Sequence, residues 1–280
     1  MKHEKITLWD KHPEATLTSY VYDNASELKA EPRPAIIICP GGGYAALSAR
    51  ESEPIASKFL AEGMNVYILR YSVKANASNF APLIEAALAI KYVRDNAQAH
   101  NTNPDKVFIG GGSAGGHLAA SAGILWNSKV VRDAIGVTDG SAPEGINKPT
   151  GVVLFYPLIT TKNYEQHPEI TAAIYRLCGT KTPTMEEVER FSLELYIDET
   201  SAPAFVWHTV EDQIVPVQNA LILVNALIEH NVPCEAHIYP TGIHGLSLCN
   251  KKTWAQRPQM YEPHAQTWID LAIKWIADMF

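Results

Sequence analysis

A serine set among glycines is the most chemically suggestive feature of the sequence. The stretch "KVFIGGGSAGGHLAA" contains G-x-G-x-x-G at Gly110, Gly112 and Gly115, and it also contains G-x-S-x-G at Gly111, Ser113 and Gly115. The first pattern is typical of a loop that holds a dinucleotide pyrophosphate, and the second of a turn that presents a nucleophilic serine. Both patterns need a strand before the glycines and a helix after them, so the local sequence leaves both interpretations open.

The dinucleotide interpretation fits the rest of the chain poorly. Its fingerprint usually follows the first strand of the sheet, with an acidic residue about 20 residues further on. Here the fingerprint follows the fifth predicted strand, and Asp133, the acid at that distance, does not end a clean strand. A near-match at Gly41, Gly43 and Ala46 follows the first buried strand, but its acid, Glu62, lies at a helix end. A dinucleotide site explains one glycine cluster only. A P-loop is excluded because no Lys-Ser or Lys-Thr follows the glycines.

The nucleophile interpretation makes further demands on the sequence. A serine nucleophile needs a histidine base, and the base needs a carboxylate that orients it. On a parallel sheet the acid and then the histidine should follow in the chain, on loops after strands. Asp212 follows the predicted strand "AFVWHT", and His244 follows "CEAHIYP". We therefore predict that Ser113, Asp212 and His244 act together, although Ser113 could be a plain helix N-cap. The rivals for the other two places are Glu211, His117 and His208.

The second glycine cluster has a place in the same chemistry. Acyl transfer requires backbone N–H groups that stabilise an oxyanion, one from the residue after the nucleophile and one from a loop after an earlier strand. Ala114 follows Ser113, and "PGGGY" supplies Gly42 and Gly43 after the third strand. One hypothesis thus uses both glycine clusters, although three glycines can also form a simple tight turn.

Taken together, these motifs resemble a known family. "PGGGY", "GGSAGGHLA", "EDQIVP" and "IHG", in this order and spacing, are similar to the carboxylesterases of the α/β-hydrolase fold. The resemblance is strongest to bacterial short-chain and carbohydrate acetyl esterases, which are related to the hormone-sensitive-lipase-like group, and it runs from about Pro34 to the C-terminus. It implies a Ser113, Asp212, His244 triad and a reaction through an acyl-enzyme.

The resemblance also implies an oxyanion hole and a substrate class. The hole would consist of the Gly42 or Gly43 amide and the Ala114 amide, and the substrates would be small esters of short acyl groups, acetyl first, including acetylated carbohydrates. A peptidase or lipase of the same fold and a non-catalytic small-molecule receptor remain alternatives. The sequence departs from the lipase-like group at Pro40, where that group has a histidine, so a role of that histidine in holding the loop does not transfer.

The elements that must position these residues follow from hydrophobic patterning. Residues 4–10 and 16–23 alternate apolar and polar side chains, as half-buried antiparallel strands do. Near-continuous apolar runs predict strands buried on both faces, and a less regular run predicts the last strand. The predicted strands are, in chain order, the stretches "AIIIC", "NVYILRY", "KVFIG", "GVVLFYP", "AFVWHT" and "CEAHIYP". Helical spacing covers 53–62, 82–96, a segment opening at Ser113, 217–229 and 261–280. The expected fold is α/β, an α/β-hydrolase with a mostly parallel eight-stranded sheet flanked by helices.

One segment interrupts this alternation after the sixth strand. Residues 161–203 contain helix formers and aromatic residues but no strand period. Long excursions between strands of a compact sheet are usually functional, so we expect a lid or binding wall inserted into a single domain, 1–280.

Composition limits the partners. The chain of 280 residues carries a net charge of −7 with 23 scattered Lys and Arg, which argues against nucleic acid. It has no long apolar run, so we expect no membrane partner and a cytoplasmic location. The chemistry needs no cofactor or metal, and a homo-oligomer is left open. The cysteines have no metal-binding spacing, and we expect buried thiols at Cys39, Cys178, Cys234 and Cys249.

Overall fold

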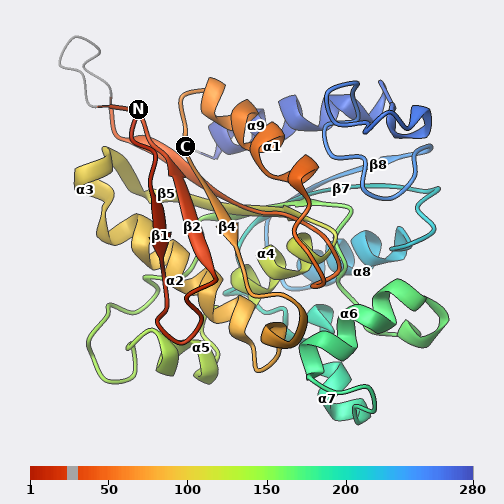
Figure 1. Ribbon diagram of the computed structural model, residues 1–280, viewed down its shortest axis with the longest axis horizontal. Helices are drawn as coiled ribbons and strands as arrows, with labels where there is room; N and C mark the ends of the chain where they lie inside the picture. The colour runs from red at the N-terminus through yellow and green to blue at the C-terminus, as the bar shows by residue number, and fades with distance from the viewer. Residues whose placement is uncertain (24–30, 280) are drawn as a thin grey trace.

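A computed structural model describes residues 1–23 and 31–279, and its centre is one eight-stranded sheet (Figure 1). The strand order across the sheet is β1-β2-β4-β3-β5-β6-β7-β8. The strands are β1 (Lys5–Thr7), β2 (Thr16–Tyr20), β3 (Arg33–Cys39), β4 (Asn65–Arg70), β5 (Thr102–Gly112), β6 (Gly151–Phe155), β7 (Ala204–Thr209) and β8 (Cys234–Tyr239). The predicted strands are all present, and β1 is shorter than its alternating pattern.

The sheet is parallel except at its N-terminal edge. β1 pairs with β2 and β2 with β4 in antiparallel fashion, while every pair from β4 across to β8 is parallel. The prediction of two antiparallel strands leading a parallel sheet is therefore confirmed. Because the strands from β4 to β8 all run the same way, the loops that follow them meet at one edge of the sheet.

Helices cover both faces of the sheet. On one face lie α2 (Ala81–Asp95), α4 (Ala114–Ile124) and α8 (Gln218–Glu229), and on the other lie α1 (Glu53–Ala61) and α9 (Trp268–Asp278), as Figure 1 shows. The other α-helices of the described residues are α3 (Ala97–His100), α5 (Lys129–Ala134), α6 (Pro168–Cys178) and α7 (Met185–Glu189). The segment 161–203 contributes α6 and α7 after β6, where the sequence predicts an insertion.

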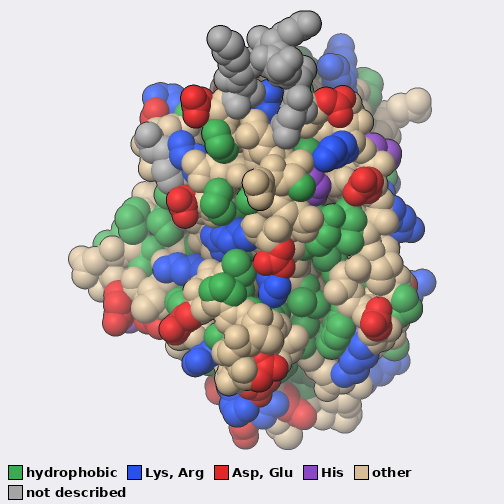
Figure 2. All heavy atoms as spheres, turned by 90° about the vertical axis from the view of Figure 1, so that its left-hand side faces the viewer, with side chains coloured by type: hydrophobic (Ala, Val, Ile, Leu, Met, Phe, Trp, Pro, Cys, Tyr) green, Lys and Arg blue, Asp and Glu red, His purple; other side chains and the backbone are tan. Residues whose placement is uncertain are grey.

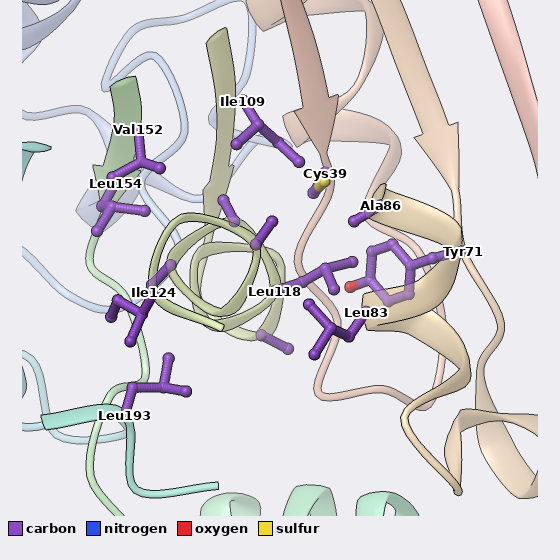
Figure 3. Packing of buried hydrophobic residues seen from close by; sticks show 14 of the residues in the cluster. Cys39, Tyr71, Leu83, Ala86, Ile109, Leu118, Ile124, Val152, Leu154 and Leu193 are labelled. Atoms are coloured by element: carbon purple, nitrogen blue, oxygen red, sulfur yellow. The ribbon is translucent and has the colours of Figure 1, made fainter. Parts of the chain in front are cut away.

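Each buried strand contributes side chains to two cores. In β5, Val107 and Ile109 pack with α2 and α4, whereas Phe108 packs on the opposite face with the cluster of α1 and α9. Figure 3 looks along α4, whose Leu118 lies beside Leu83 and Tyr71. β5 and α4 are therefore both held by packing, one before and one after the turn at Ser113 that joins them.

Two predictions need correction. The C-terminal helix begins at Trp268 rather than at residue 261, because Pro263 disfavours helical backbone at the residue before it, and only a short 3-10 turn (Ala265–Thr267) precedes α9. The predicted end, Phe280, lies outside the described residues. All cysteines are free, but Cys178 and Cys234 are only half-buried, because Cys178 ends a helix and Cys234 begins the edge strand β8.

The surface carries charges of both signs. On the face in Figure 2, basic and acidic side chains are interspersed with apolar ones. None of the helices described for residues 1–23 and 31–279 is long and apolar enough to cross a membrane. Within the same residues, no three His, Cys, Asp or Glu side chains are grouped so that they could hold a metal ion.

Candidate active site

Ser113 lies at a sharp turn between β5 and α4. Its backbone has a positive φ of 55° with a ψ of −121°, a combination that is uncommon and strained for a residue with a side chain. A Cβ atom on Gly111 would lie 2.3 Å from the Gly115 carbonyl oxygen, and one on Gly115 would lie 2.0 Å from the Cys39 carbonyl oxygen. Gly111 and Gly115 are therefore required, because the end of β3, the end of β5 and the start of α4 lie too close together to leave room for side chains.

A chain of hydrogen bonds runs from this serine through His244 to Asp212. His244 Nε2 lies 2.8 Å from Ser113 Oγ, and its Nδ1 lies 2.6 Å from Asp212 Oδ2. Because an ionised carboxylate only accepts hydrogen bonds, His244 donates from Nδ1 and can accept the serine proton at Nε2. The structure thus brings the predicted residues together from loops after β5, β7 and β8.

Asp212 is held by more donors than His244 alone. Its Oδ1 accepts the N–H groups of Ile214 and Val215, each at 2.9 Å. Its Oδ2 also lies 3.2 Å from Nε2 of His208, a fully buried side chain of β7. Burial by itself would raise the pKa of Asp212, but the hydrogen bonds from His208 and His244 outweigh it and hold the pKa well below its ordinary value. Asp212 is therefore an anion in the folded protein.

The rival residues occupy other positions. Glu211 accepts the Gly242 N–H at 3.0 Å, and it bonds to no histidine among the residues that the structure describes. His117 is a buried residue of α4 and lies between the Tyr44 hydroxyl and the Phe191 carbonyl oxygen. His208 reaches Asp212, but from inside the sheet. Sequence reasoning treated His208 only as a rival base, because nothing in a strand pattern tells which face carries the imidazole.

The glycine turn after β3 and the start of α4 border one cavity. It has a volume of about 470 Å³ and is lined by Ser113, Ala114 and His244 together with Gly42 and Gly43. Ala114 is the first residue of α4, and the first N–H groups of a helix have no partner within it. The cavity wall is completed by apolar side chains, Leu158, Ile170, Ala173, Ile214 and Val215, and by charged ones, Arg50, Glu51, Glu169, Arg176 and Arg257.

A buried carboxylate that the sequence analysis missed joins the glycine turn to the histidine loop. Glu51, only 3% exposed, accepts the Gly41 N–H at 2.7 Å and the Tyr156 hydroxyl at 2.8 Å. The same hydroxyl accepts the Ser247 N–H at 2.9 Å, and the Tyr156 ring packs edge-on against His244. Burial, followed by the Glu51 charge, raises the pKa of Tyr156, so the phenol stays protonated and can donate.

The arrangement can support nucleophilic chemistry on a carbonyl group. A hydroxyl hydrogen-bonded to an imidazole, which is oriented by a buried carboxylate, opens into a cavity beside a helix N-terminus and a glycine turn. These are the features that acyl transfer uses.

Comparisons with known proteins agree with this geometry. Residues 20–227 match the BD-FAE family. The chain is 34% identical over 221 residues to endo-1,4-beta-xylanase B of Butyrivibrio fibrisolvens. The matched region covers 78% of this chain and 33% of that protein. It is also 28% identical over 217 residues to the acetylxylan esterase of Xylanibacter ruminicola, and this match covers 76% of this chain and 41% of that protein. This chain therefore spans less than half the length of these relatives.

A solved structure matches over the whole chain. The carboxylesterase Cest-2923 from Lactobacillus plantarum is 28% identical, with a TM-score of 0.84, and the match covers 100% of this chain and 98% of that one. The fold is that of an α/β hydrolase, as predicted.

Proposed function

The chain belongs to the BD-FAE family, and we propose on that basis that it is a serine esterase that hydrolyses carboxylic esters of short acyl groups. The observation that carries the proposal is the hydrogen-bonded series Ser113, His244 and Asp212 at the wall of a cavity. The acetylxylan esterase and carboxylesterase among its relatives support an ester as substrate.

The reaction proceeds through an acyl-enzyme. His244 Nε2 takes the Ser113 proton while Oγ attacks the ester carbonyl carbon, and the C=O electron pair moves onto the carbonyl oxygen. Collapse of this tetrahedral intermediate breaks the bond to the alcohol oxygen, which takes the proton from His244. Water then attacks the acyl-enzyme with the same proton transfers and releases the carboxylic acid. Asp212, kept anionic, orients His244 and stabilises its protonated form.

The oxyanion is stabilised by backbone N–H groups. Ala114 supplies one from the start of α4, and the Gly42 or Gly43 amide supplies the other. These donors are fixed before the substrate arrives, which is why such sites stabilise a developing charge better than water does.

The substrate fits a cavity of modest size. A volume of about 470 Å³ accommodates a short acyl group together with part of a polar alcohol. Charged side chains stand beside apolar ones in its wall, which disfavours long acyl chains. We propose acetyl esters, including those of acetylated carbohydrates, as the preferred class.

Initial rates on chromogenic esters with acyl chains from two to ten carbons test this proposal, together with acetate release from acetylated xylo-oligosaccharides. We expect the acetyl ester to react fastest and acetate to be released. A preference for the ten-carbon ester would indicate a lipase instead, and no hydrolysis of any ester would favour a non-catalytic receptor.

A further inference from the structure

The glycine turn after β3 adopts a backbone conformation that needs support. Gly42, Gly43 and Tyr44 have consecutive positive φ values of 133°, 60° and 55°, and a tyrosine in this region is unfavourable without compensation. The start of the turn is held by Tyr71, whose hydroxyl donates to the Pro40 carbonyl oxygen at 2.6 Å.

Packing fixes the first part of the turn but not its end. A Cβ atom on Gly41 would lie 2.7 Å from the Gly112 carbonyl oxygen, and one on Gly42 would lie 2.2 Å from the Ala46 carbonyl oxygen. A Cβ atom on Gly43 would meet nothing within 4 Å. Gly43 is thus the glycine of this turn that faces open space, with no packed atom beside its Cα on that side.

Hydrogen bonds to carbonyl oxygens orient each peptide group of the turn. In a trans peptide the C=O and N–H groups point to opposite sides, so fixing one fixes the other. Gly41 O accepts the Ser48 N–H at 2.9 Å, and Gly42 O accepts the Ala45 N–H at 3.0 Å. Gly43 O accepts a side-chain donor, Nη1 of Arg176, at 3.0 Å.

A second connection reaches the turn from the same segment. The Tyr44 hydroxyl donates to Nδ1 of His117 at 2.8 Å, and His117 donates from Nε2 to the Phe191 carbonyl oxygen at 3.1 Å. Burial lowers the pKa of His117 to about 4, so the imidazole is neutral and can accept and donate in this way. Arg176 and Phe191 both belong to residues 161–203.

We propose that Arg176 is a positioning residue for the oxyanion hole, and that the segment 161–203 braces the glycine turn through it. The guanidinium fixes the Gly43–Tyr44 peptide, which directly follows the Gly42 and Gly43 amides. Holding this peptide limits rotation about the Gly43 Cα atom and so keeps the two preceding amide donors aimed into the Ser113 cavity. This inference rests on the proposed esterase activity. Arg176 also brings a permanent positive charge to the cavity wall, where the other charged groups are Arg50, Glu51, Glu169 and Arg257.

The test compares R176M and R176K with R190M. Arg190 lies in the same segment and forms an exposed ion pair with Glu186, so R190M is a matched control. Removing an oxyanion donor itself costs 10²–10³ in kcat, and losing its support should cost less. We expect R176M to lower kcat for an acetyl ester about tenfold with KM changed less than about threefold. R176K, which keeps a donor and a charge, should recover part of the rate.

Two readouts separate positioning from a general loss of stability. Affinity for an arylboronic acid, which forms a tetrahedral adduct on Ser113 with an oxygen in the oxyanion hole, should fall in R176M by the same factor as kcat. Hydrogen–deuterium exchange should accelerate in residues 40–48 of R176M and stay unchanged in R190M.

The outcomes are distinct. An active wild type with unchanged kcat, boronate affinity and exchange in R176M overturns the inference and leaves the esterase proposal standing. The inference is also overturned if kcat falls in every variant, R190M included, in proportion to the loss of melting temperature. A wild type that hydrolyses no ester and binds no boronate overturns both proposals together.

Discussion

Asp212, the acid of the proposed triad, is in contact with a second histidine, His208. Asp212 Oδ2 contacts Nε2 of His208 as well as Nδ1 of His244. His208 Nε2 also lies 2.8 Å from the Val215 carbonyl oxygen. Both partners of Nε2 can only accept, so this nitrogen carries the hydrogen. His208 therefore ties the loop of Asp212 to β7, and its own Nδ1 is buried without a partner among the described residues.

Replacing His208 tests this role at the scale of one residue. H208F removes the donor to Asp212 and Val215 and keeps a ring of similar size. We expect kcat to fall about tenfold and the free energy of unfolding to drop by about 1–3 kcal/mol, since two buried acceptors lose a donor. Ester kinetics and urea unfolding measure the two effects. The control is H237F on β8, which loses a half-exposed pair with Glu235 and keeps a ring against Phe205. Equal effects in both variants would contradict the assignment.

At the scale of elements, α2 carries a buried acid away from the active site. Glu85 is fully buried, and its carboxyl group accepts the N–H and the hydroxyl of Ser72, which follows β4. Burial raises the pKa of Glu85 from 4.5 to about 7, and the bonds from Ser72 offset only part of that rise. The acid is therefore neutral in the folded protein over a pH range in which it is ionised in the unfolded chain.

This pKa gives stability a pH dependence of known sign. Between pH 4.5 and about 7 the folded protein holds a proton on Glu85 that the unfolded chain has lost. The free energy of unfolding therefore falls as pH rises through that window, by at most about 3 kcal/mol from this residue. E85Q should lack this component, so that urea-unfolding curves of wild type and E85Q diverge between pH 5 and pH 8. Parallel pH profiles would show that the raised pKa is wrong. E53Q, at an exposed acid of α1, should follow the wild type.

At the scale of the whole molecule, the sheet separates two cores that both reach the active site. α4 lies in one core and presents Ser113 at its start, while the His244 loop packs with the other. That loop is tied to α9 by the Trp268 indole N–H, which donates to the Ser247 carbonyl oxygen at 2.9 Å. Trp268 also stacks on Trp207 of β7. The proposed nucleophile and base are thus held from opposite faces of one sheet.

This organisation explains what could be predicted from the sequence. Buried strands are readable as apolar runs, and loops after parallel strands meet at one edge, so the strands and the candidates Ser113, Asp212 and His244 follow from pattern and order. The side chains that support them do not. Glu51, Arg176 and His208 act across long sequence separations or from inside the sheet, where no local spacing marks them. The start of α9 was missed because apolar periodicity continues through Pro263, where the backbone does not follow it.

The most direct test of the central claim compares S113A with S121A. Ser121 lies in α4, the helix that Ser113 caps, and is buried. Its hydroxyl donates to the His117 carbonyl oxygen, away from the cavity. Loss of a nucleophilic serine costs on the order of 10⁴–10⁶ in kcat. On an acetyl ester we predict such a loss for S113A, and a rate within a few fold of wild type for S121A. A rate for S113A within tenfold of wild type would contradict the account.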